Sequence, residues 1–166
     1  MRVWLAGWCR WLDRLIVVRN AALRGLVDFD ATISPDGNTL FYTEGLFAFL
    51  SVPIAGTMKM ATRSGSGFAS TPNGDDTLRE INAGGVAYAP AISQSGLEIF
   101  FNRLERGTPI IYTATRASTA VPFGAALRVT GIDGFAEGPA LSPDEKSLYY
   151  HRQDAGRFVL YRVTRP

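Results

Sequence analysis

The chain has 166 residues, of which 46% are hydrophobic and 19% charged; this excludes a disordered protein and is typical of one domain with a sizeable core. The net charge is +2 and the excess of arginine lies within residues 1–19, so the rest of the chain lacks the basic stripe of a nucleic-acid-binding protein. Cys9 is the only cysteine and His151 the only histidine, which excludes an intrachain disulfide and argues against a zinc site.

Residues 1–22 form a leader that precedes the repetitive part of the chain. Trp4, Trp8 and Trp11 recur at helical spacing with charged residues between them, which predicts a short amphipathic helix packed on the domain, unless the start codon is misassigned. An interfacial membrane helix is the alternative interpretation. Charges interrupt the apolar run, so we find no clear signal peptide, and no stretch approaches the roughly 20 apolar residues of a transmembrane span.

Residues 23–166 contain three copies of one pattern, each centred on a serine. The serines are Ser34, Ser93 and Ser142. Each follows an aliphatic residue and precedes an aliphatic-aromatic-aromatic triplet, which is Leu40-Phe41-Tyr42, Ile99-Phe100-Phe101 or Leu148-Tyr149-Tyr150. A Thr-Arg pair ends a further apolar segment of each copy, at Arg63, Arg116 and Arg165. The copies divide this part of the chain into units of about 23–77, 78–126 and 127–166.

The serine of each copy opens a predicted β-turn. In Ser34-Pro35-Asp36-Gly37 the proline fixes φ, the aspartate suits the third position and the glycine supplies a positive φ. The second turn, from Ser93 to Gly96, has Gln94-Ser95 in place of Pro-Asp. The third, Ser142-Pro143-Asp144, has Glu145 in place of glycine. We expect the second and third turns to be weaker or of another type.

Runs of β-branched and aromatic residues flank each turn and predict short antiparallel strands. Inner strands are expected at 29–33, 88–92 and 137–141, second strands at 39–43, 98–102 and 147–151, third strands at 57–62, 109–115 and 158–164, and outer strands at 78–82 and 126–130. The rings of Phe100 and Tyr149 are expected to be buried between neighbouring sheets. This pattern predicts an all-β fold, a partial β-propeller of about three four-stranded antiparallel blades.

The serine turns, the aromatic strands after them and the Thr-Arg endings resemble the WD40-like PD40 repeat, which builds the six-bladed TolB-type propeller. The resemblance covers residues 23–166. It implies a β-propeller repeat protein with a binding or scaffold role, in a family whose members are often exported to the periplasm or cell surface. It does not name a ligand, and fold analogy alone does not settle function.

Candidate ligand-binding residues lie on the expected inner strands, which face the central channel in propellers. Asp28 and Asp30 alternate along one strand and share a face, and Tyr88 and Glu137 lie on the other two inner strands. Solvated strand residues are the alternative interpretation. No carboxylate is expected near His151.

The other repeated polar residues are expected to be structural. The residues of the repeat turns are Ser34, Pro35, Asp36, Gly37, Ser93, Gly96, Ser142, Pro143 and Asp144. Arg63, Arg116 and Arg165 could form an anion-binding triad, but the position of each at a third-strand end favours structural ion pairs or packing of the side-chain stems.

The sequence contains no nucleophile elbow and no multi-ligand acidic cluster, so we expect no enzymatic activity, no cofactor and no metal site. The favoured hypothesis is a non-enzymatic binding or scaffold module for a protein, peptide or glycan. The alternative is a propeller fragment of a hydrolase-associated protein, prolyl-oligopeptidase-like or glycan-acting, whose catalytic part is absent. An open arc of three blades exposes apolar end sheets, so we also expect either self-association through the open blade edges or a fragment of a longer propeller.

Overall fold

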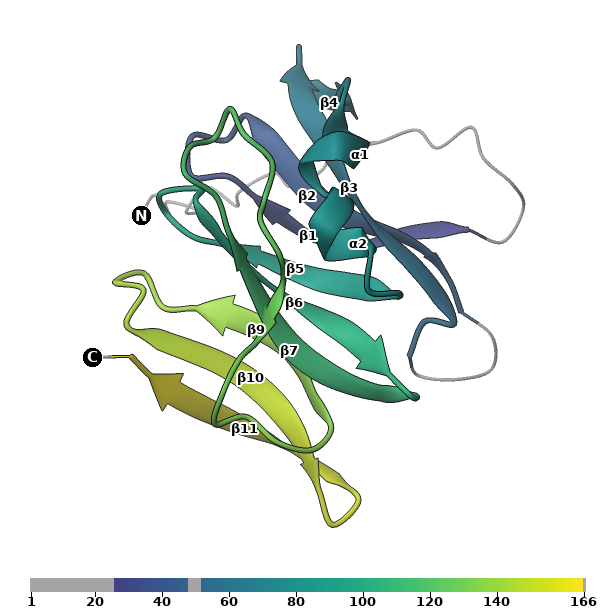
Figure 1. Cartoon of the computed structure of the whole chain (residues 1–166), viewed down its shortest axis with the longest axis vertical. Helices are drawn as coiled ribbons and strands as arrows, with labels where there is room; N and C mark the ends of the chain where they lie inside the picture. Colours follow the sequence, from purple (N-terminus) through teal and green to yellow (C-terminus); the bar gives the residue numbers. More distant parts are fainter. Residues whose placement is uncertain (1–25, 48–51, 166) are drawn as a thin grey trace, which may run out of the picture.

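The structure, a computed structural model, describes residues 26–47 and 52–165, which form three antiparallel β-sheets that follow one another along the chain (Figure 1). The first sheet contains β1 (Val27–Ile33), β2 (Thr39–Leu46), β3 (Ala55–Ser64) and β4 (Gly67–Ser70). The second contains β5 (Ala87–Ile92), β6 (Glu98–Glu105), β7 (Thr108–Thr115) and β8 (Leu127–Arg128). The third contains β9 (Ala136–Leu141), β10 (Ser147–Asp154) and β11 (Arg157–Thr164). The predicted all-β propeller architecture is confirmed, with three or four strands in each sheet.

The predicted outer strand at 78–82 is wrong, because this segment is helical. Leu78 joins two single-turn helices, α1 (Gly74–Thr77) and α2 (Arg79–Asn82), and α2 covers the rest of the segment. Leu78 and Ile81 are three residues apart, so a helical turn points both side chains to the core, where both are fully buried. The fourth strand of the first sheet is β4, which pairs with the end of β3.

The three serine turns have the same geometry, which corrects the expectation that two of them differ in type. The backbone N–H of Gly37, Gly96 and Glu145 donates to the carbonyl of the turn serine at 2.8, 2.9 and 2.8 Å. The same three residues have φ of +71°, +69° and +56°. Glu145 therefore adopts the left-handed conformation that glycine adopts in the other two turns, at a cost that the surrounding contacts offset.

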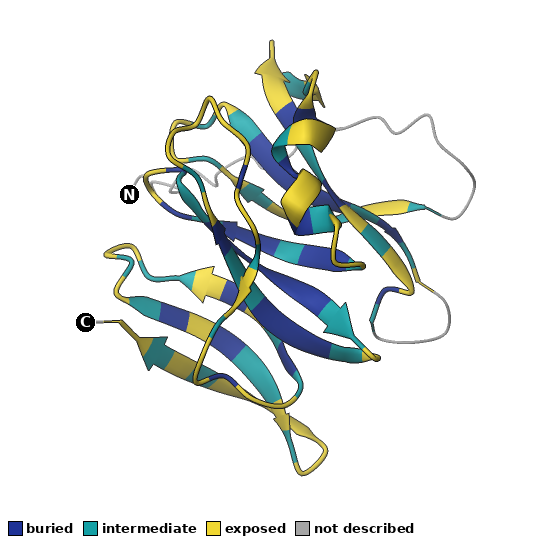
Figure 2. Ribbon diagram, in the orientation of Figure 1, coloured by how far each residue is buried: buried dark blue, intermediate teal, exposed yellow. Residues whose placement is uncertain are grey.

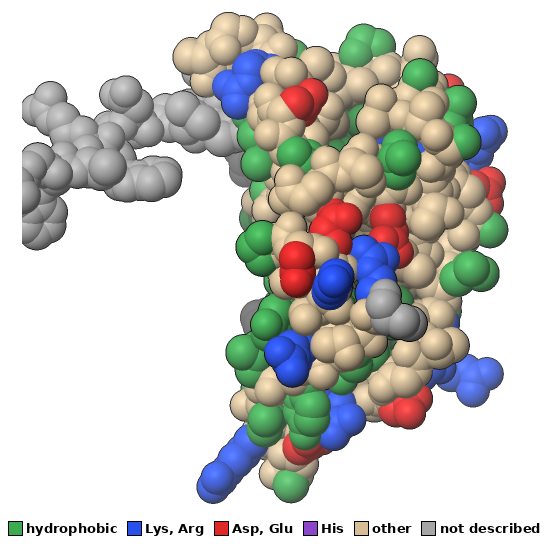
Figure 3. All heavy atoms as spheres, turned by 90° about the vertical axis from the view of Figure 1, so that its left-hand side faces the viewer, with side chains coloured by type: hydrophobic (Ala, Val, Ile, Leu, Met, Phe, Trp, Pro, Cys, Tyr) green, Lys and Arg blue, Asp and Glu red, His purple; other side chains and the backbone are tan. Residues whose placement is uncertain are grey.

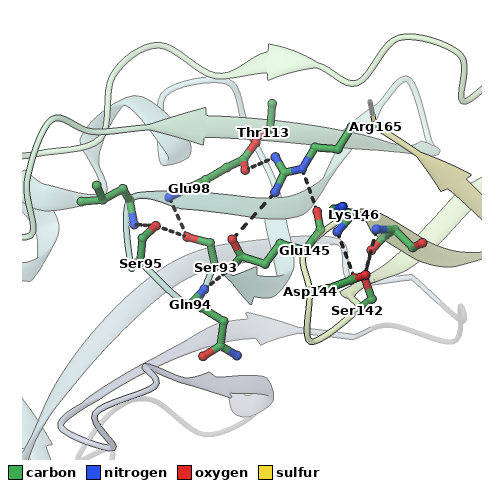
Figure 4. A network of polar contacts seen from close by, with 12 residues as sticks. Ser93, Gln94, Ser95, Glu98, Thr113, Ser142, Asp144, Glu145, Lys146 and Arg165 are labelled. Carbon is green, nitrogen blue, oxygen red and sulfur yellow. Dashed lines mark hydrogen bonds and ion pairs between the residues drawn. The ribbon is translucent and has the colours of Figure 1, made fainter.

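Each serine side chain closes its own turn, as Figure 4 shows for the second and third turns. The Oγ atoms of Ser34, Ser93 and Ser142 accept the N–H of the first residue of the next strand at 2.8, 3.0 and 2.9 Å. Ser34 and Ser142 also donate to the turn aspartate, at 2.5 Å in each case. In the second turn Ser95 stands in the aspartate position, with its Oγ 3.0 Å from that of Ser93.

The repeated arginines bind these turns. The Nε atoms of Arg63, Arg116 and Arg165 donate to the backbone carbonyls of Gly37, Gly96 and Glu145 at 2.8, 2.8 and 2.7 Å. Each arginine therefore joins the end of a third strand to the turn before the second strand.

The hydrophobic core lies between the sheets, so the second sheet is buried on both faces (Figure 2). One core cluster joins Phe41 of the first sheet to Ile99 and Phe101 of the second. The other joins Phe100 of the second sheet to Leu148 and Tyr150 of the third.

The predicted burial of Tyr149 is wrong, whereas that of Phe100 is confirmed. Phe100 is 7% exposed because the third sheet covers it, but Tyr149 is 36% exposed. Tyr149 points away from Leu148 and Tyr150, which face the second sheet. No described sheet lies on the Tyr149 side.

The predicted helix or irregular leader at 1–22 lies outside the described residues. Within the described part of the chain, no helix has the length and hydrophobicity needed to cross a membrane.

Candidate functional site

Each inner strand contains a β-bulge at the same position of the repeat. The bulged residues are Asp30, Ala89 and Gly138, with φ of +49°, +53° and +65°. The register between inner and second strand shifts at all three positions. Two of the three residues are not glycine, so the backbone is strained there, and such bulges re-aim neighbouring side chains.

The residues just before the bulges, Phe29, Tyr88 and Glu137, come together on three adjacent inner strands. They line an open pocket of about 250 Å³. The complete lining is Phe29, Asp30, Phe47, Pro53, Tyr88, Ala89, Glu137, Gly138 and His151. Three strands from three sheets thus build one site, which combines two carboxylates with aromatic walls. We call it the channel pocket.

Glu137 is the centre of the polar contacts in the channel pocket. The Tyr88 hydroxyl donates to Glu137 Oε1, which joins β5 to β9 across the boundary between two sheets. On the other side, His151 Nε2 lies 3.3 Å from Glu137 Oε2. The expectation that no carboxylate lies near His151 is therefore wrong. The two residues are direct neighbours in the β9–β10 pairing, which the bulge at Gly138 brings about.

Glycine suits position 138 for two reasons. Its φ is positive, and a Cβ atom there would lie 3.2 Å from the His151 ring. The buried Asn102 holds the bulge in place, because its Nδ2 donates to the carbonyl of Ala136 at 2.8 Å and its Oδ1 accepts the N–H of Gly138 at 2.9 Å. The wall that carries Glu137 is thus fixed by a side chain of the second sheet.

The channel pocket raises the pKa values of two of its titratable groups, Asp30 and Tyr88. Partial burial and, second, the nearby Glu137 carboxylate raise the pKa of Asp30 above its usual value of 3.8. Burial and then the hydrogen bond to Glu137 raise the pKa of Tyr88, so its hydroxyl stays protonated and acts as a donor. The site therefore concentrates negative charge and has no phenolate base.

Of the candidates predicted from sequence, Asp30, Tyr88 and Glu137 lie together in the channel pocket. Asp28 is exposed and does not line it, although burial raises its pKa as well. Phe47 and Pro53 line the pocket but were not predicted, because the segment that contains them has no counterpart in the other repeats.

The serine turns follow the C-terminal ends of the inner strands, whereas the channel pocket lies nearer the N-terminal ends of these strands. Hydrogen bonds with Ser34 and Asn38 hold the pKa of Asp36 below its usual value. The hydrogen bond with Ser142 and, second, that with the N–H of Lys146 lower the pKa of Asp144 in the same way. Figure 3 shows this side of the molecule, where acidic and basic side chains lie next to one another.

No group of three or more side chains able to hold a metal ion occurs within the described ranges 26–47 and 52–165. Among the described residues that line the pocket, none is a serine, threonine, cysteine or lysine that could act as a nucleophile. The arrangement suits binding through charge, hydrogen bonds and aromatic contact.

Comparisons with known proteins support the fold. No family model matches the sequence, and no curated protein matches it. Among solved structures, TolB from Acinetobacter baumannii aligns with 84% of this chain and 30% of its own, at 19% identity and a TM-score of 0.53. A putative TolB from Agrobacterium tumefaciens aligns with 84% of this chain and 58% of its own, at 16% identity and a TM-score of 0.46. A puromycin-hydrolyzing peptidase from Mycobacterium tuberculosis aligns with 89% of this chain and 23% of its own, at 19% identity and a TM-score of 0.47.

Of these structures, the Acinetobacter TolB has a TM-score above 0.5. The chain spans about a third of the length of that TolB, and at 19% identity the likeness concerns the fold alone. The described sheets, their order and this likeness together show that the chain has a TolB-like propeller fold.

Proposed function

We propose that this chain is a non-enzymatic propeller binding module that holds a cationic group of a protein or peptide partner in the channel pocket. The observation that carries the proposal is the convergence of Asp30 and Glu137 among aromatic side chains in one pocket. The repeated turn and strand pattern further supports assigning the three units to the PD40 type.

Electrostatics favour a cation over a neutral ligand. The carboxylate of Glu137 raises the pKa of Asp30, which means that the two charges repel each other. An ammonium or guanidinium group between them would relieve this repulsion. Within the described part of the chain, Asp30 has no hydrogen-bond or ion-pair partner, so its carboxylate is available to a ligand.

The pocket walls also suit a cation. Phe29, Phe47 and Tyr88 present aromatic rings to the pocket, and ring faces attract cations by roughly 0.5–2 kcal/mol each. The volume of about 250 Å³ is large enough for the end of a lysine or arginine side chain and too small for a whole folded partner. The rest of the partner would lie on the surrounding loops.

The absence of enzymatic activity is part of the proposal. The repeated serines are the most numerous candidate nucleophiles, but their side chains form hydrogen bonds within their own turns. The Oγ of Ser34, for example, accepts the N–H of Thr39 and donates to Asp36. Tyr88 is held protonated against Glu137. Among the described residues, these contacts leave neither a repeated serine nor Tyr88 free to act as a nucleophile in the channel pocket.

The test is calorimetric titration of the full chain with the short peptides acetyl-Gly-Arg-Gly-amide and acetyl-Gly-Gln-Gly-amide. We expect the arginine peptide to bind and the glutamine peptide to bind at least about tenfold more weakly. Asp30→Asn should remove most of the difference, whereas Asp36→Asn, which removes an exposed carboxylate far from the pocket, should not. Equal binding of the two peptides, or a preference for neutral oligosaccharides that Asp30→Asn leaves intact, would contradict a cation site.

A further inference from the structure

His151 lies in the channel pocket, directly beside one of its two carboxylates. Its Nε2 is 3.3 Å from Glu137 Oε2, and the two residues are paired neighbours on β10 and β9. Phe158 of β11 packs against the imidazole, with ring centroids 5.1 Å apart and planes at 84°. Gly138, which has no Cβ atom, leaves the imidazole room to lie there. The ring is therefore held in place against Glu137.

The two oxygens of Glu137 face partners of different kinds. Oε1 accepts the Tyr88 hydroxyl, whereas Oε2 faces His151. Tyr88 brings no charge, because burial and the hydrogen bond to Glu137 keep its hydroxyl protonated. His151 is neutral or cationic according to whether its second ring nitrogen carries a proton. Among the described residues that contact Glu137, it is thus the one that can compensate the carboxylate charge.

The exposure of the two side chains suits a proton-dependent contact. The Glu137 side chain is 14% exposed, whereas that of His151 is 41% exposed. Water screens a shielded carboxylate less, so its interaction with a nearby positive charge is stronger than on an open surface. The imidazole, in contrast, is open to water and can exchange its proton with the solvent.

Other titratable and charged groups surround His151 on several strands. They are Glu137 of β9, Tyr88 of β5, Asp30 of β1, Arg162 of β11 and, on β10 itself, Tyr149. Glu137, Tyr88 and Asp30 line the pocket together with His151, whereas Arg162 pairs with Tyr149 on the same face of the third sheet and does not line it. Of these types of side chain, histidine is the one that ordinarily changes its charge between pH 5 and 8.

We infer, on the basis of the cation site proposed above, that protonation of His151 releases the bound cation, so that the module holds its partner at neutral pH and frees it in mildly acidic solution. The imidazolium and the cationic group of the partner compete for one carboxylate, Glu137. Once His151 is protonated, it pairs with Glu137 and places a second positive charge inside the pocket. Binding free energies are reciprocal, so a bound cation must oppose the protonation of His151 to the same extent.

The first measurement is calorimetric titration of the full chain with acetyl-Gly-Arg-Gly-amide at about pH 8 and about pH 5.5, on either side of the ordinary histidine titration. The termini of this peptide are blocked and its guanidinium stays charged at both pH values, so the ligand itself does not change. We expect binding to be about threefold or more weaker at the lower pH. Circular dichroism checks that the fold is the same in both solutions.

The second measurement follows the proton directly. His151 is the only histidine of the chain, so a single imidazole signal appears in the NMR spectrum and needs no assignment by mutation. The midpoint of its titration should lie about half a pH unit or more lower with saturating peptide than without peptide. This shift does not arise from protonation of Asp30, which also affects ligand binding.

Three variants separate the imidazole charge from other effects. His151→Gln cannot take up a proton, so its affinities at the two pH values should agree within about twofold. His151→Lys has a fixed positive charge and should bind as weakly at about pH 8 as the unmodified chain does at about pH 5.5. Arg162→Gln is the matched control, because it removes a charge from the same sheet face outside the pocket and should retain the pH dependence.

Equal affinities of the unmodified chain at the two pH values would overturn the proton coupling alone and leave the cation site in place. The coupling is also overturned if the pH dependence persists in His151→Gln, which would assign it to Asp30, or if the peptide does not move the imidazole titration. That last measurement decides the matter if the His151 variants fail to fold. Absence of binding at both pH values would contradict the cation site itself, and the proton coupling with it.

Discussion

Phe41 and Phe123 meet edge to face, with ring centroids 6.4 Å apart and planes at 70°, although they belong to different repeats. Phe41 lies on the second strand of the first sheet, and Phe123 lies in the segment that leads to the outer strand of the second. The hydrophobic core beside one sheet is thus filled in part by a side chain of the next repeat. In the same way, an aromatic residue of the repeat is buried only where a neighbouring sheet or segment covers it.

The first prediction contrasts Phe100→Ala with Tyr149→Ala, two residues at the same repeat position. Phe100 is 7% exposed between two sheets, so its truncation should destabilise the fold by about 3–5 kcal/mol. Tyr149 is 36% exposed, and its loss should cost about 1 kcal/mol or less. Urea unfolding followed by circular dichroism measures both. Equal losses would contradict the exposure of the Tyr149 face.

The contrast shows what the repeat pattern can predict. The pattern identifies equivalent positions, and hence the inner, second and third strands, because strand alternation and turn chemistry are local properties. It does not identify which neighbour covers a position: Phe100 and Tyr149 are equivalent in sequence, and only the third sheet distinguishes them. The helical segment at Leu78 and Ile81 was predicted as a strand, because two aliphatic residues in a short segment are compatible with a helical turn and with a strand.

The channel pocket was predictable in part for the same reason. Asp30, Tyr88 and Glu137 follow from their inner-strand positions. The β-bulges of the inner strands do not follow from the sequence at Asp30 and Ala89, since both adopt a left-handed conformation without a glycine to mark it. Only Gly138 offered a sequence clue.

The second prediction concerns the serine turns. Ser93 is 1% exposed, and its Oγ accepts the N–H of Glu98 at 3.0 Å. Ser93→Ala should leave this N–H without its acceptor and destabilise the fold by about 1–2 kcal/mol. Ser95→Ala, at an exposed position of the same turn, should cost less than half as much. A larger loss for Ser95→Ala in thermal unfolding would show that the side chain of the third turn residue, and not that of the first, secures the turn.

The third prediction separates strain from steric contact at Gly138. Gly131 and Gly138 both have positive φ, of +82° and +65°, but a Cβ on Gly131 meets nothing within 4 Å, whereas a Cβ on Gly138 lies 3.2 Å from His151. Gly131→Ala should therefore cost about 1 kcal/mol, from backbone strain alone. Gly138→Ala should cost more and should weaken binding in the channel pocket. Chemical denaturation of the two variants measures both stability losses. A loss for Gly138→Ala no larger than that for Gly131→Ala would show that the His151 ring moves aside freely.

The fourth prediction is a pH dependence from Asp30. Burial and Glu137 raise the pKa of Asp30 in the folded state above the value of 3.8, so the folded protein binds this proton more tightly than the unfolded chain. Stability from this group is therefore present below about pH 4 and is lost as the pH rises through the folded-state pKa.

Asp30→Asn should accordingly raise the melting temperature at pH 7, where the unfavourable charge is removed, and should have little effect near pH 3. Asparagine also tolerates the left-handed φ of +49° at this position. The gain should stay below about 1 kcal/mol, since Asp30 is only partly buried and solvent screens its charge. A stability loss at pH 7 would mean that Asp30 makes a favourable contact with its charge intact.

The last prediction concerns self-association through the third sheet. Leu160 pairs with His151 and Phe158 with Gln153, which places both apolar side chains on the Tyr149 face, where they are 73% and 53% exposed. Apolar side chains grouped on one sheet face mark an interaction surface. We therefore expect light scattering to give about twice the 18.1 kDa mass of the chain. Leu160→Lys should restore the monomer, whereas Val159→Lys, on the opposite face of β11, should not. If the unmodified chain is monomeric, or if both lysine variants act alike, the Tyr149 face is not the interface.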